Sequence, residues 1–564
     1  MTNFKGLICI AVLAVAMSGG SARAVRLANQ DKRGLRASSI EGVLRLSDEE
    51  IDIGTAALLV SRQWGTNRTL ASYRSKIDTM AEAILTRMEK KKIPADWRAL
   101  PVINDYLFKE SGFKSIETAD DPEDLFLHRV LDEKKGYCLS LSMLYLAITE
   151  RVGLPVYGVV VPGHFFVRYD DGQKRINIET TSKGNTADDQ HYIEKFPYPA
   201  GTRGIYLENL NNRQTLGCFF NNLGNSYSQV GKADEAFEQL KRAVQINPKL
   251  AEAHTNLGNL YLRRKMPEDA LHEYEQAQSI LGRDFAVFNN IGNTYMELGQ
   301  YGLAEGYYIR AIELKRDSTD AYRNLSQAYE AQNKIEQALS YLRAAAAISP
   351  DDWQNWMCLG NCYRKTAEYE PARQAYEKAL RLKPQEASIR IGLGYLYLDQ
   401  KQGEPALNEF LSATELASGD VNGWFGLAQS CNMLGQTKRE IEVYQKLLEI
   451  SPGMTAAMQN LGNAYMKLEK TDQAIQLYAA ALLKEPGNGD LHYNLAVAYA
   501  KMERYGEATG EYRQTIKLLP EHAAAYHGLA ICFYMTKQYD SSRQAAQKAK
   551  ALGYDVPEEL LNSR

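Results

Sequence analysis

Residues 353–386 read WQNWMCLGNCYRKTAEYEPARQAYEKALRLKPQE, and this 34-residue pattern decides the fold of most of the chain. A small residue, Gly360, stands at its eighth position, and the same phase continues in both directions without an insertion. The small residues of the successive units are Gly224, Gly258, Gly292, Ser326, Gly360, Gly394, Ala428, Gly462, Ala496 and Ala530. The spacing therefore predicts ten repeats over residues 217–556.

Each unit carries the residues that close packing of two helices needs. The small eighth position lets the helices approach, and a ring at the eleventh position, such as Tyr363, fills the space between them. The signature positions of one known repeat are all matched by Trp356, Leu359, Gly360, Tyr363, Ala372, Tyr376, Ala379 and Pro384. The pattern resembles the tetratricopeptide repeat (TPR). The resemblance implies an all-α solenoid of about ten repeats, whose concave groove binds extended peptides or partner proteins.

Asparagine recurs at positions 6 and 9 of the repeats, which lie on one face of the first helix. Each side chain offers a donor and an acceptor, which suits the backbone of an extended peptide. The pattern resembles the asparagine ladder in the repeat domain of O-linked N-acetylglucosamine transferase. We therefore predict peptide-binding roles for Asn222, Asn225, Asn256, Asn259, Asn290, Asn293, Asn324, Asn361, Asn460, Asn463 and Asn494. The alternative is that repeats copied from one another simply share an asparagine.

In repeats five to seven the ladder is interrupted, and apolar residues stand on the groove side of the first helices. Position 5 becomes Met357, Ile391 and Phe425 there. This part of the groove could bind a partner's hydrophobic side chains, although ordinary variation in packing between repeats explains the change equally well.

A different kind of sequence precedes the repeats. Residues 25–119 are expected to form an N-terminal helical region, with apolar positions spaced from Ile77 to Met88. Two helices and then strands rich in Val, Phe and Ile predict an α+β unit over residues 120–205. Residues 206–216 are expected to be a linker, and residues 557–564 a C-terminal tail.

Cys138 stands at the start of the second helix of this α+β unit, which is predicted over residues 139–151. A thiol at that place meets the positive end of the helix dipole, which favours the thiolate that a nucleophile needs. Two strands follow, and Asp171-Gly172 between them predicts a two-residue hairpin turn. In that register His164 lies directly opposite Glu179, close enough for the carboxylate to hold the imidazole in one tautomer.

Cysteine, histidine and carboxylate in this order resemble the transglutaminase-like superfamily, which has a papain-like α+β fold, and residues 107–184 resemble its SirB1 branch. The matching segments are Asp121-Pro122, Val130-Leu131, Lys135-Gly136, Gly153-Leu154-Pro155 and Pro162-Gly163-His164-Phe165. The resemblance implies that Cys138 is the nucleophile, His164 the general base and acid, and Glu179 the orienting carboxylate. Aspartate usually fills that last role. The alternative is an inert buried cysteine beside a plain His–Glu ion pair.

The N-terminus predicts export. Lys5 precedes a short apolar core at residues 6–17, and Ala22-Arg23-Ala24 supplies small residues for cleavage, so residues 1–24 are predicted to be a signal peptide. Twelve apolar residues are fewer than the roughly 20 that a membrane-spanning helix needs. The mature chain is therefore expected to begin at Val25, to have no membrane association, and to be periplasmic or secreted.

Charge and cysteine usage restrict the partners. The chain has 66 lysines and arginines against 69 aspartates and glutamates, a formal net charge of −3, which argues against a nucleic-acid partner. The seven cysteines match no zinc signature, so we expect no metal and no cofactor.

These observations predict an exported transglutaminase-like cysteine enzyme, acting as a peptidase, amidase or acyl transferase on protein or peptide amides. Its TPR solenoid would bind protein substrates or partners. The alternative is a non-catalytic TPR adaptor that assembles partners at the cell envelope. The sequence leaves three points open: whether the chain is an enzyme or an adaptor, whether the acyl acceptor is water or an amine, and what the oligomeric state is.

Overall fold

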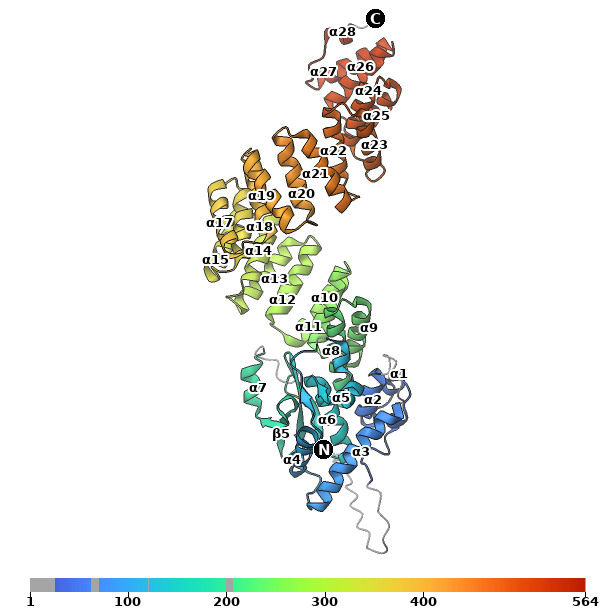
Figure 1. Cartoon of the computed structure of the whole chain (residues 1–564), viewed down its shortest axis with the longest axis vertical. Helices are drawn as coiled ribbons and strands as arrows, with labels where there is room; N and C mark the ends of the chain where they lie inside the picture. The colour runs from blue at the N-terminus through green and yellow to red at the C-terminus, as the bar shows by residue number, and fades with distance from the viewer. Residues whose placement is uncertain (1–25, 62–69, 120, 199–205, 563–564) are drawn as a thin grey trace, which may run out of the picture. The chain divides into compact units, whose positions relative to one another are not determined.

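The computed structural model describes residues 26–61, 70–119, 121–198 and 206–562 (Figure 1). The predicted signal peptide and Val25 lie outside the described residues. The chain divides into two compact units, Met1–Lys315 and Arg316–Arg564, and each is described by itself.

The first unit contains an α+β part and the first repeats. The helices of the α+β part are α1 (Ile40–Leu44), α2 (Ile53–Ser61), α3 (Leu70–Lys90), α4 (Leu100–Asn104), α5 (Leu127–Glu133), α6 (Cys138–Val152) and α7 (Asp189–Lys195). Its strands are β1 (Lys114–Ser115), β2 (Lys135–Gly136), β3 (Val156–Val161), β4 (His164–Asp170), β5 (Arg175–Glu179) and β6 (Asn185–Ala187). The following helices of this unit are α8 (Asn212–Gln229), α9 (Ala233–Ile246), α10 (Ala251–Arg263), α11 (Pro267–Leu281), α12 (Phe285–Glu297) and α13 (Tyr301–Leu314).

Helix α6 is the centre of the α+β part, because nearly all of its side chains are buried. It packs against α2, α3 and α5 and against strands β3 and β4. Arg151, near its C-terminal end, is fully buried and forms ion pairs with Asp52 at 3.4 Å and Asp78 at 2.5 Å. These ion pairs join α6 to the segments that hold α2 and α3.

The N-terminal helices, which the sequence predicts as a region of their own up to residue 119, pack into the same core as the α+β part. One cluster of buried apolar side chains runs from Leu27 through α2, α3 and α6 to Leu260 in α10. The predicted apolar positions of α3 take part in it: Ile77, Ile84 and Met88 are buried. The α+β part and the first repeats therefore share one hydrophobic core.

The main sheet has four antiparallel strands in the order β3-β4-β5-β6. A tight turn at Pro162-Gly163 connects β3 to β4, and Val161 pairs with His164. Gly163 has a φ of +70°, a conformation that glycine adopts without strain. This turn places His164 at the first position of β4, as the sequence predicts.

The β4–β5 connection is wider than the sequence predicts. Asp170 pairs with Arg175, so residues 171–174 form a four-residue loop and the predicted register is wrong by two residues. The Asp171 carboxylate accepts hydrogen bonds from the backbone N–H groups of Gln173 and Lys174 at 2.9 and 2.7 Å, which stabilises the wider loop. Because the shift is two residues, each side chain stays on its predicted face of the sheet.

The repeat helices form antiparallel pairs, such as α8 with α9 and α10 with α11. Helix α8 begins at Asn212, so residues 212–216 are helical rather than part of the expected linker. A capping box stabilises this N-terminus of α8, because Asn211 Oδ1 accepts a hydrogen bond from the Gln214 backbone N–H at 2.8 Å.

The second unit continues the TPR array. Its helices are α14 (Thr319–Ala331), α15 (Ile335–Ile348), α16 (Trp353–Lys365), α17 (Tyr369–Leu382), α18 (Ala387–Asp399), α19 (Gly403–Leu416), α20 (Val421–Met433), α21 (Thr437–Ile450), α22 (Thr455–Lys467), α23 (Thr471–Leu482), α24 (Gly489–Lys501), α25 (Tyr505–Leu518), α26 (Ala523–Met535), α27 (Tyr539–Ala551) and α28 (Glu558–Leu561). The expected tail thus contains the short helix α28, whose Leu560 is buried.

The small eighth position of the repeats has a clear packing reason. A Cβ atom on Gly258 would lie 2.7 Å from the Tyr274 ring, and one on Gly360 would lie 2.8 Å from the Tyr376 ring. The ring that needs this space comes from the second helix of the same repeat. A small residue is therefore needed where a tyrosine from the paired helix packs against the first helix, and it is glycine at these two positions but alanine at Ala428 and Ala496, which face Tyr444 and Tyr512.

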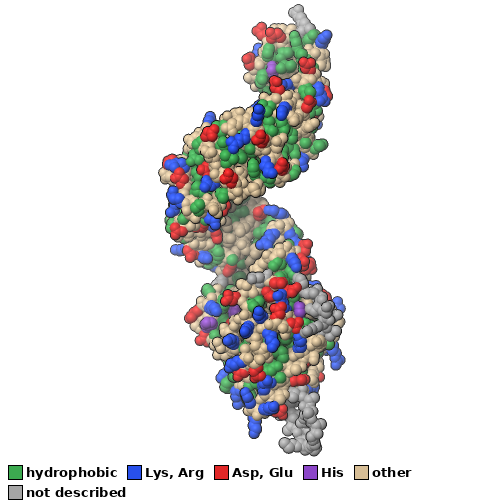
Figure 2. Space-filling view, viewed as in Figure 1, with side chains coloured by type: hydrophobic (Ala, Val, Ile, Leu, Met, Phe, Trp, Pro, Cys, Tyr) green, Lys and Arg blue, Asp and Glu red, His purple; other side chains and the backbone are tan. Residues whose placement is uncertain are grey.

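The surface agrees with the balanced composition. Figure 2 shows basic and acidic side chains interspersed over the face that it draws. Among the residues that the structure describes, no helix has both the length and the apolar composition of a membrane span.

Candidate active site

Cys138 is the first residue of α6, and the local sequence fixes it there. The chain enters from β2 through Gly136, where a Cβ atom would lie 2.9 Å from Ser140 Oγ. The Tyr137 backbone N–H donates to the same Ser140 Oγ at 2.9 Å, which holds the chain as it enters the helix. Cys138 is 5% exposed and lies at the positive end of the helix dipole.

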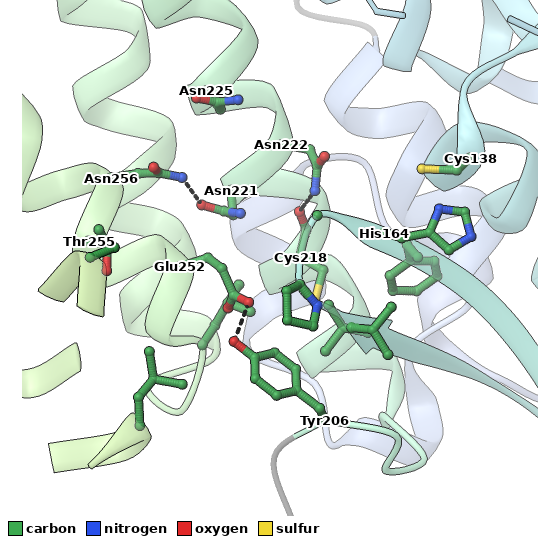
Figure 3. Close-up of a pocket in the computed structure, with 18 of the residues that line it drawn as sticks. Cys138, His164, Tyr206, Cys218, Asn221, Asn222, Asn225, Glu252, Thr255 and Asn256 are labelled. Carbon is green, nitrogen blue, oxygen red and sulfur yellow. Dashed lines mark hydrogen bonds between the residues drawn. The ribbon is translucent and has the colours of Figure 1, made fainter. Parts of the chain in front are cut away.

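His164 and Glu179 form the hydrogen bond that the sequence predicts. The distance from His164 Nε2 to Glu179 Oε2 is 2.7 Å, and the two side chains are 14% and 15% exposed. The other ring nitrogen, Nδ1, is left for the thiol, and His164 and Cys138 interact. Figure 3 shows the two side chains next to each other at one end of a cavity. The structure thus brings together all three predicted catalytic residues.

The wider hairpin explains why the carboxylate is a glutamate. With the observed register, Glu179 lies across from residue 166, so His164 is its diagonal neighbour instead of its direct partner. Diagonal backbone positions are roughly 7 to 8 Å apart, against about 5 Å for direct ones. The additional methylene of glutamate, compared with aspartate, helps to span this larger separation.

Glu179 is held by more than its histidine. Its Oε1 accepts hydrogen bonds from the Thr181 backbone N–H at 3.1 Å and from Thr181 Oγ1 at 2.6 Å. The Tyr192 hydroxyl donates to its Oε2 at 3.3 Å. Burial raises the pKa of Glu179, but the bonds with His164 and Thr181 outweigh burial and hold that pKa below its usual range. The carboxylate is therefore ionised and fixed in orientation.

The electrostatics of His164 favour its charged form. Burial lowers the pKa of the imidazole, but its interactions with Cys138 and Glu179 outweigh burial and raise the pKa to about 9. The ring also stacks on Phe196, with a centroid separation of 4.9 Å and an interplanar angle of 5°. At neutral pH the site therefore holds an imidazolium in a fixed plane between Cys138 and the Glu179 carboxylate.

Residues that support this triad include several that sequence reasoning missed. Thr181 and Tyr192 bind Glu179, and Phe196 packs against the histidine ring. Thr181 had a local signal, since a threonine two residues after an acidic side chain can hydrogen-bond to it. Tyr192 and Phe196 lie on or after α7 and had no such signal, because their contacts depend on how α7 packs over the sheet.

A cavity of about 400 Å³ opens beside Cys138 and His164. Pro162, Gly163 and Phe165 of the β3–β4 turn line it on one side. The first helices of the first repeats supply the opposite wall, which Figure 3 shows with Asn221, Asn222, Asn225 and Asn256. A cavity of this volume is in the range of natural ligand sites. Cys138 therefore faces a space that is shared with the TPR array.

Three of the predicted ladder residues, Asn222, Asn225 and Asn256, line this cavity. Asn256 Nδ2 donates to Asn221 Oδ1 at 3.0 Å, and Asn222 Nδ2 donates to the Cys218 carbonyl oxygen at 3.0 Å. The remaining predicted residues do not line it: Asn259, Asn290, Asn293, Asn324, Asn361, Asn460, Asn463 and Asn494. Their peptide-binding role stays a prediction.

Position 9 of the ladder also has a structural use. The hydroxyl of the second-helix tyrosine donates to the asparagine in four repeats: Tyr274 to Asn259, Tyr308 to Asn293, Tyr376 to Asn361 and Tyr478 to Asn463. Each bond measures 2.6 to 2.8 Å. These tyrosines are the buried rings behind the small eighth position, so the asparagine satisfies a hydroxyl that packing buries. Asn225 is exposed and lacks this tyrosine, because Leu240 occupies the equivalent position.

The other described cysteines have no comparable setting. Burial raises the pKa of the Cys358, Cys362 and Cys532 thiols, to about 11, 12 and 11 respectively. Burial also raises the pKa of Cys218 and Cys431. Cys218 lines the same cavity as Cys138 but has no histidine partner among the described hydrogen bonds. Within the described residues, no group of three or more His, Cys, Asp or Glu side chains is placed to hold a metal ion.

Comparison with known protein families agrees with both parts of the chain. The family model of the transglutaminase-like superfamily matches residues 71–217. TPR models match residues 224–264, 285–318, 315–453, 460–511 and 498–556. The first match begins inside α3, which agrees with the shared core of α3 and α6.

Relatives among curated proteins are distant. A "UPF0162 protein" of Xylella fastidiosa is 24% identical over 217 residues, which cover 37% of this chain and 76% of the relative. One of Pseudomonas aeruginosa is 24% identical over 134 residues, covering 24% of this chain and 50% of the relative. The mouse (Mus musculus) "F-box only protein 21" is 30% identical over 83 residues, covering 14% of this chain and 13% of that protein.

Solved structures similar to the chain include that of Pseudomonas aeruginosa PilF. The two chains are 24% identical over the matched part, which spans 39% of this chain and 100% of the PilF chain, and the TM-score is 0.34. YrrB, described as a TPR protein with an unusual peptide-binding site, is 23% identical to this chain. The match spans 31% of this chain and 89% of the YrrB chain, with a TM-score of 0.27.

The narrower SirB1 assignment stays a prediction. The family matches and the order of elements together show that this chain consists of a transglutaminase-like domain followed by a TPR array.

Proposed function

We propose that the chain is a cysteine acyl-transfer enzyme that acts on peptide or protein amides, with the first repeats forming part of the substrate site. The observation that carries this proposal is the cavity in which Cys138 and His164 face Asn222 and Asn256. An inert cysteine beside an ion pair would need no such cavity, whereas a nucleophile needs room for its substrate.

The chemistry follows from the triad. The Cys138 thiolate attacks the carbonyl carbon of the amide, and the imidazolium of His164 donates its proton to the departing nitrogen. The C–N bond breaks and a thioester with Cys138 forms. The acceptor, water or an amine, then gives a proton to neutral His164, attacks the thioester and releases the acyl group. Glu179 holds the imidazole in plane and stabilises its charged form.

The positive end of α6 supports the same step. Backbone N–H groups in the first turn of a helix have no partner within the helix, and they favour negative charge. Cys138 is in that turn, so both its thiolate and the oxyanion that forms next to it benefit.

The TPR array supplies binding, as TPR repeats generally do for proteins and peptides. Asn222, Asn225 and Asn256 are placed to meet the backbone of an extended chain as it reaches Cys138. Export through residues 1–24, to the periplasm or the outside of the cell, is part of the same proposal.

The proposal is tested by trapping the thioester. The purified full chain is incubated with a library of acylated peptide amides and hydroxylamine, which converts a thioester to a hydroxamate that mass spectrometry detects. We expect hydroxamates from the wild type and from Cys218→Ala, and none from Cys138→Ala. Equal amounts of hydroxamate from Cys138→Ala and the wild type would contradict the enzyme and favour the adaptor. The absence of hydroxamate from all three proteins would do the same.

A further inference from the structure

One end of the cavity carries acidic groups that the proposed chemistry does not use. Glu252, in the first turn of α10, and Asp284, the N-cap residue of α12, both line it. Neither lysine nor arginine occurs among the residues that line this cavity in the described part of the chain. The wall formed by the repeats therefore carries two carboxyl groups without a basic neighbour in the lining.

Glu252 is only half satisfied. Its Oε1 accepts a hydrogen bond from the Tyr206 hydroxyl at 2.7 Å, which Figure 3 shows. Its Oε2 is buried and has no hydrogen-bond partner among the residues that the structure describes. A buried carboxyl oxygen without a partner is costly, and Glu252 lines the cavity, so a ligand that reaches this oxygen from the cavity would remove that cost.

No basic side chain among the described lining residues compensates the negative charge at this end of the cavity. Burial raises the pKa of Glu252, and the nearby negative charge of Asp284 raises it further, although the bond from Tyr206 opposes both effects. A cation bound between the two carboxyl groups would remove this cost. The existing partner, Tyr206, is neutral and cannot do so.

The walls next to these carboxyl groups are apolar. Leu250, Leu281 and Val287 line the cavity and are themselves 4%, 8% and 1% exposed. Such walls suit the methylene stem of a long side chain that ends in a charge. A metal ion fits this place less well, because Ca²⁺ takes six to eight oxygen ligands and only two carboxyl groups occur among the described lining residues.

We propose that Glu252 and Asp284 form a specificity site for a lysine- or arginine-like side chain of the substrate, whose neighbouring backbone then lies at Cys138. The site rests on the proposed function, because it names the class of peptide that the enzyme acts on. It adds a selection for cationic side chains to the sequence-independent contacts that the asparagines make.

The experiment uses pairs of tripeptide acyloxymethyl ketones that differ only in one residue, lysine or norleucine. The Cys138 thiolate displaces the carboxylate leaving group of such a ketone, so a C–S bond forms as the C–O bond breaks, and mass spectrometry reports the rate. The variable residue is placed at each of the three positions in turn. We expect the lysine reagent to react at least 10-fold faster at one position, and the ratio to fall to within 2-fold in the Glu252→Gln/Asp284→Asn protein.

The substitutions are chosen to keep the fold. Glutamine can still accept from Tyr206, and asparagine is as good an N-cap as aspartate. Glu238→Gln is the matched control, because Glu238 is an exposed glutamate of α9 outside the cavity lining. Its lysine-to-norleucine ratio should equal that of the wild type.

Failure of this inference is distinguishable from failure of the enzyme. Equal rates for lysine and norleucine in the wild type, or a ratio that survives in the double variant, would overturn the specificity site while Cys138 still reacts. If Cys138 does not react at all, the enzyme fails. Binding of the unreactive lysine and norleucine tripeptide amides to Cys138→Ala then decides the site: tighter lysine binding supports it, and equal binding overturns it.

Discussion

Replacing Glu179 by glutamine should lower the pKa of His164 without moving the ring. Glutamine has the same shape as glutamate and can still accept a hydrogen bond from His164 Nε2, which the carboxylate now does at 2.7 Å. It removes the negative charge that stabilises the imidazolium. The stacking on Phe196 does not involve the carboxylate and should keep the ring in its plane.

The size of the effect follows from the present pKa. The rise from 6.5 to about 9 corresponds to a free-energy preference for the charged ring on the order of 3 kcal/mol. Cys138 and Glu179 share this preference, and burial opposes it. We therefore expect the pKa in Glu179→Gln to lie between 6.5 and 9, and to fall to 6.5 or below when Cys138→Ala is added.

The sign for stability follows directly. Because the folded pKa of His164 exceeds its unfolded value, its contribution to the free energy of unfolding is fully present below about pH 6.5. It is lost as the pH rises from there through about 9. The Glu179→Gln protein should therefore lose stability relative to the wild type mainly below pH 9.

The assay is NMR titration of the imidazole carbons in ¹³C-histidine-labelled protein, which contains only 8 histidines. His254, which contacts Glu273 at 2.7 Å, is the internal control, and its resonances should be the same in the wild type and in Glu179→Gln. A wild-type pKa of His164 near 6.5, or one that is the same in Glu179→Gln, would refute the electrostatic account of the site.

Three further predictions concern the repeats and the N-terminus. Replacing Asn222, Asn225 and Asn256 by alanine should slow turnover of peptide amides at least 10-fold, whereas alanine at Asn460 and Asn494, which stand at the same repeat position as Asn222 and Asn256 but outside the cavity lining, should have less than a 2-fold effect; the reverse order in a kcat/KM comparison would contradict the location of the substrate site. Gly258→Ala should lower the free energy of unfolding by about 1 to 3 kcal/mol, because its Cβ would lie 2.7 Å from the Tyr274 ring. Gly306→Ala in α13, where nothing lies within 4 Å of the new Cβ, should instead raise the free energy of unfolding by about 0.5 to 1 kcal/mol, and urea unfolding of both variants checks the contrast. N-terminal sequencing of protein isolated from its native host should give Val25 as the first residue, and a chain that still begins at Met1 would contradict export by signal cleavage.

The TPR array and the triad could be predicted because both depend on local patterns. Each 34-residue unit contains the residues that specify its own helical hairpin, so the small residue at position 8 and the residues around it predict the two helices. Cys138 at a helix start and His164 after Pro162-Gly163 are likewise local features. The hairpin register failed because Asp170 and Asp171 bind backbone N–H groups and widen the loop, a competition that the Asp-Gly pair alone does not reveal.

Features that depend on packing between distant segments could not be predicted. The sequence shows neither that α3 shares the core of α6 nor that the first repeats form a wall of the cavity. Glu252 and Tyr206 stand 46 positions apart, and their contact depends on the docking of α10 beside the sheet. The asparagine–tyrosine bonds were missed for another reason: both residues recur with the period, but only the packed hairpin shows that they meet.

The central claim is that Cys138 is a nucleophile activated by His164, and selective alkylation tests it most directly. The full chain is treated with iodoacetamide at pH 7, and peptide mapping follows the rate at each thiol in the wild type and in His164→Ala. The account predicts that Cys138 reacts at least 100-fold faster than Cys218 in the same cavity, and that His164→Ala removes most of this difference. Equal rates at Cys138 and Cys218, or a fast Cys138 that does not depend on His164, would contradict it.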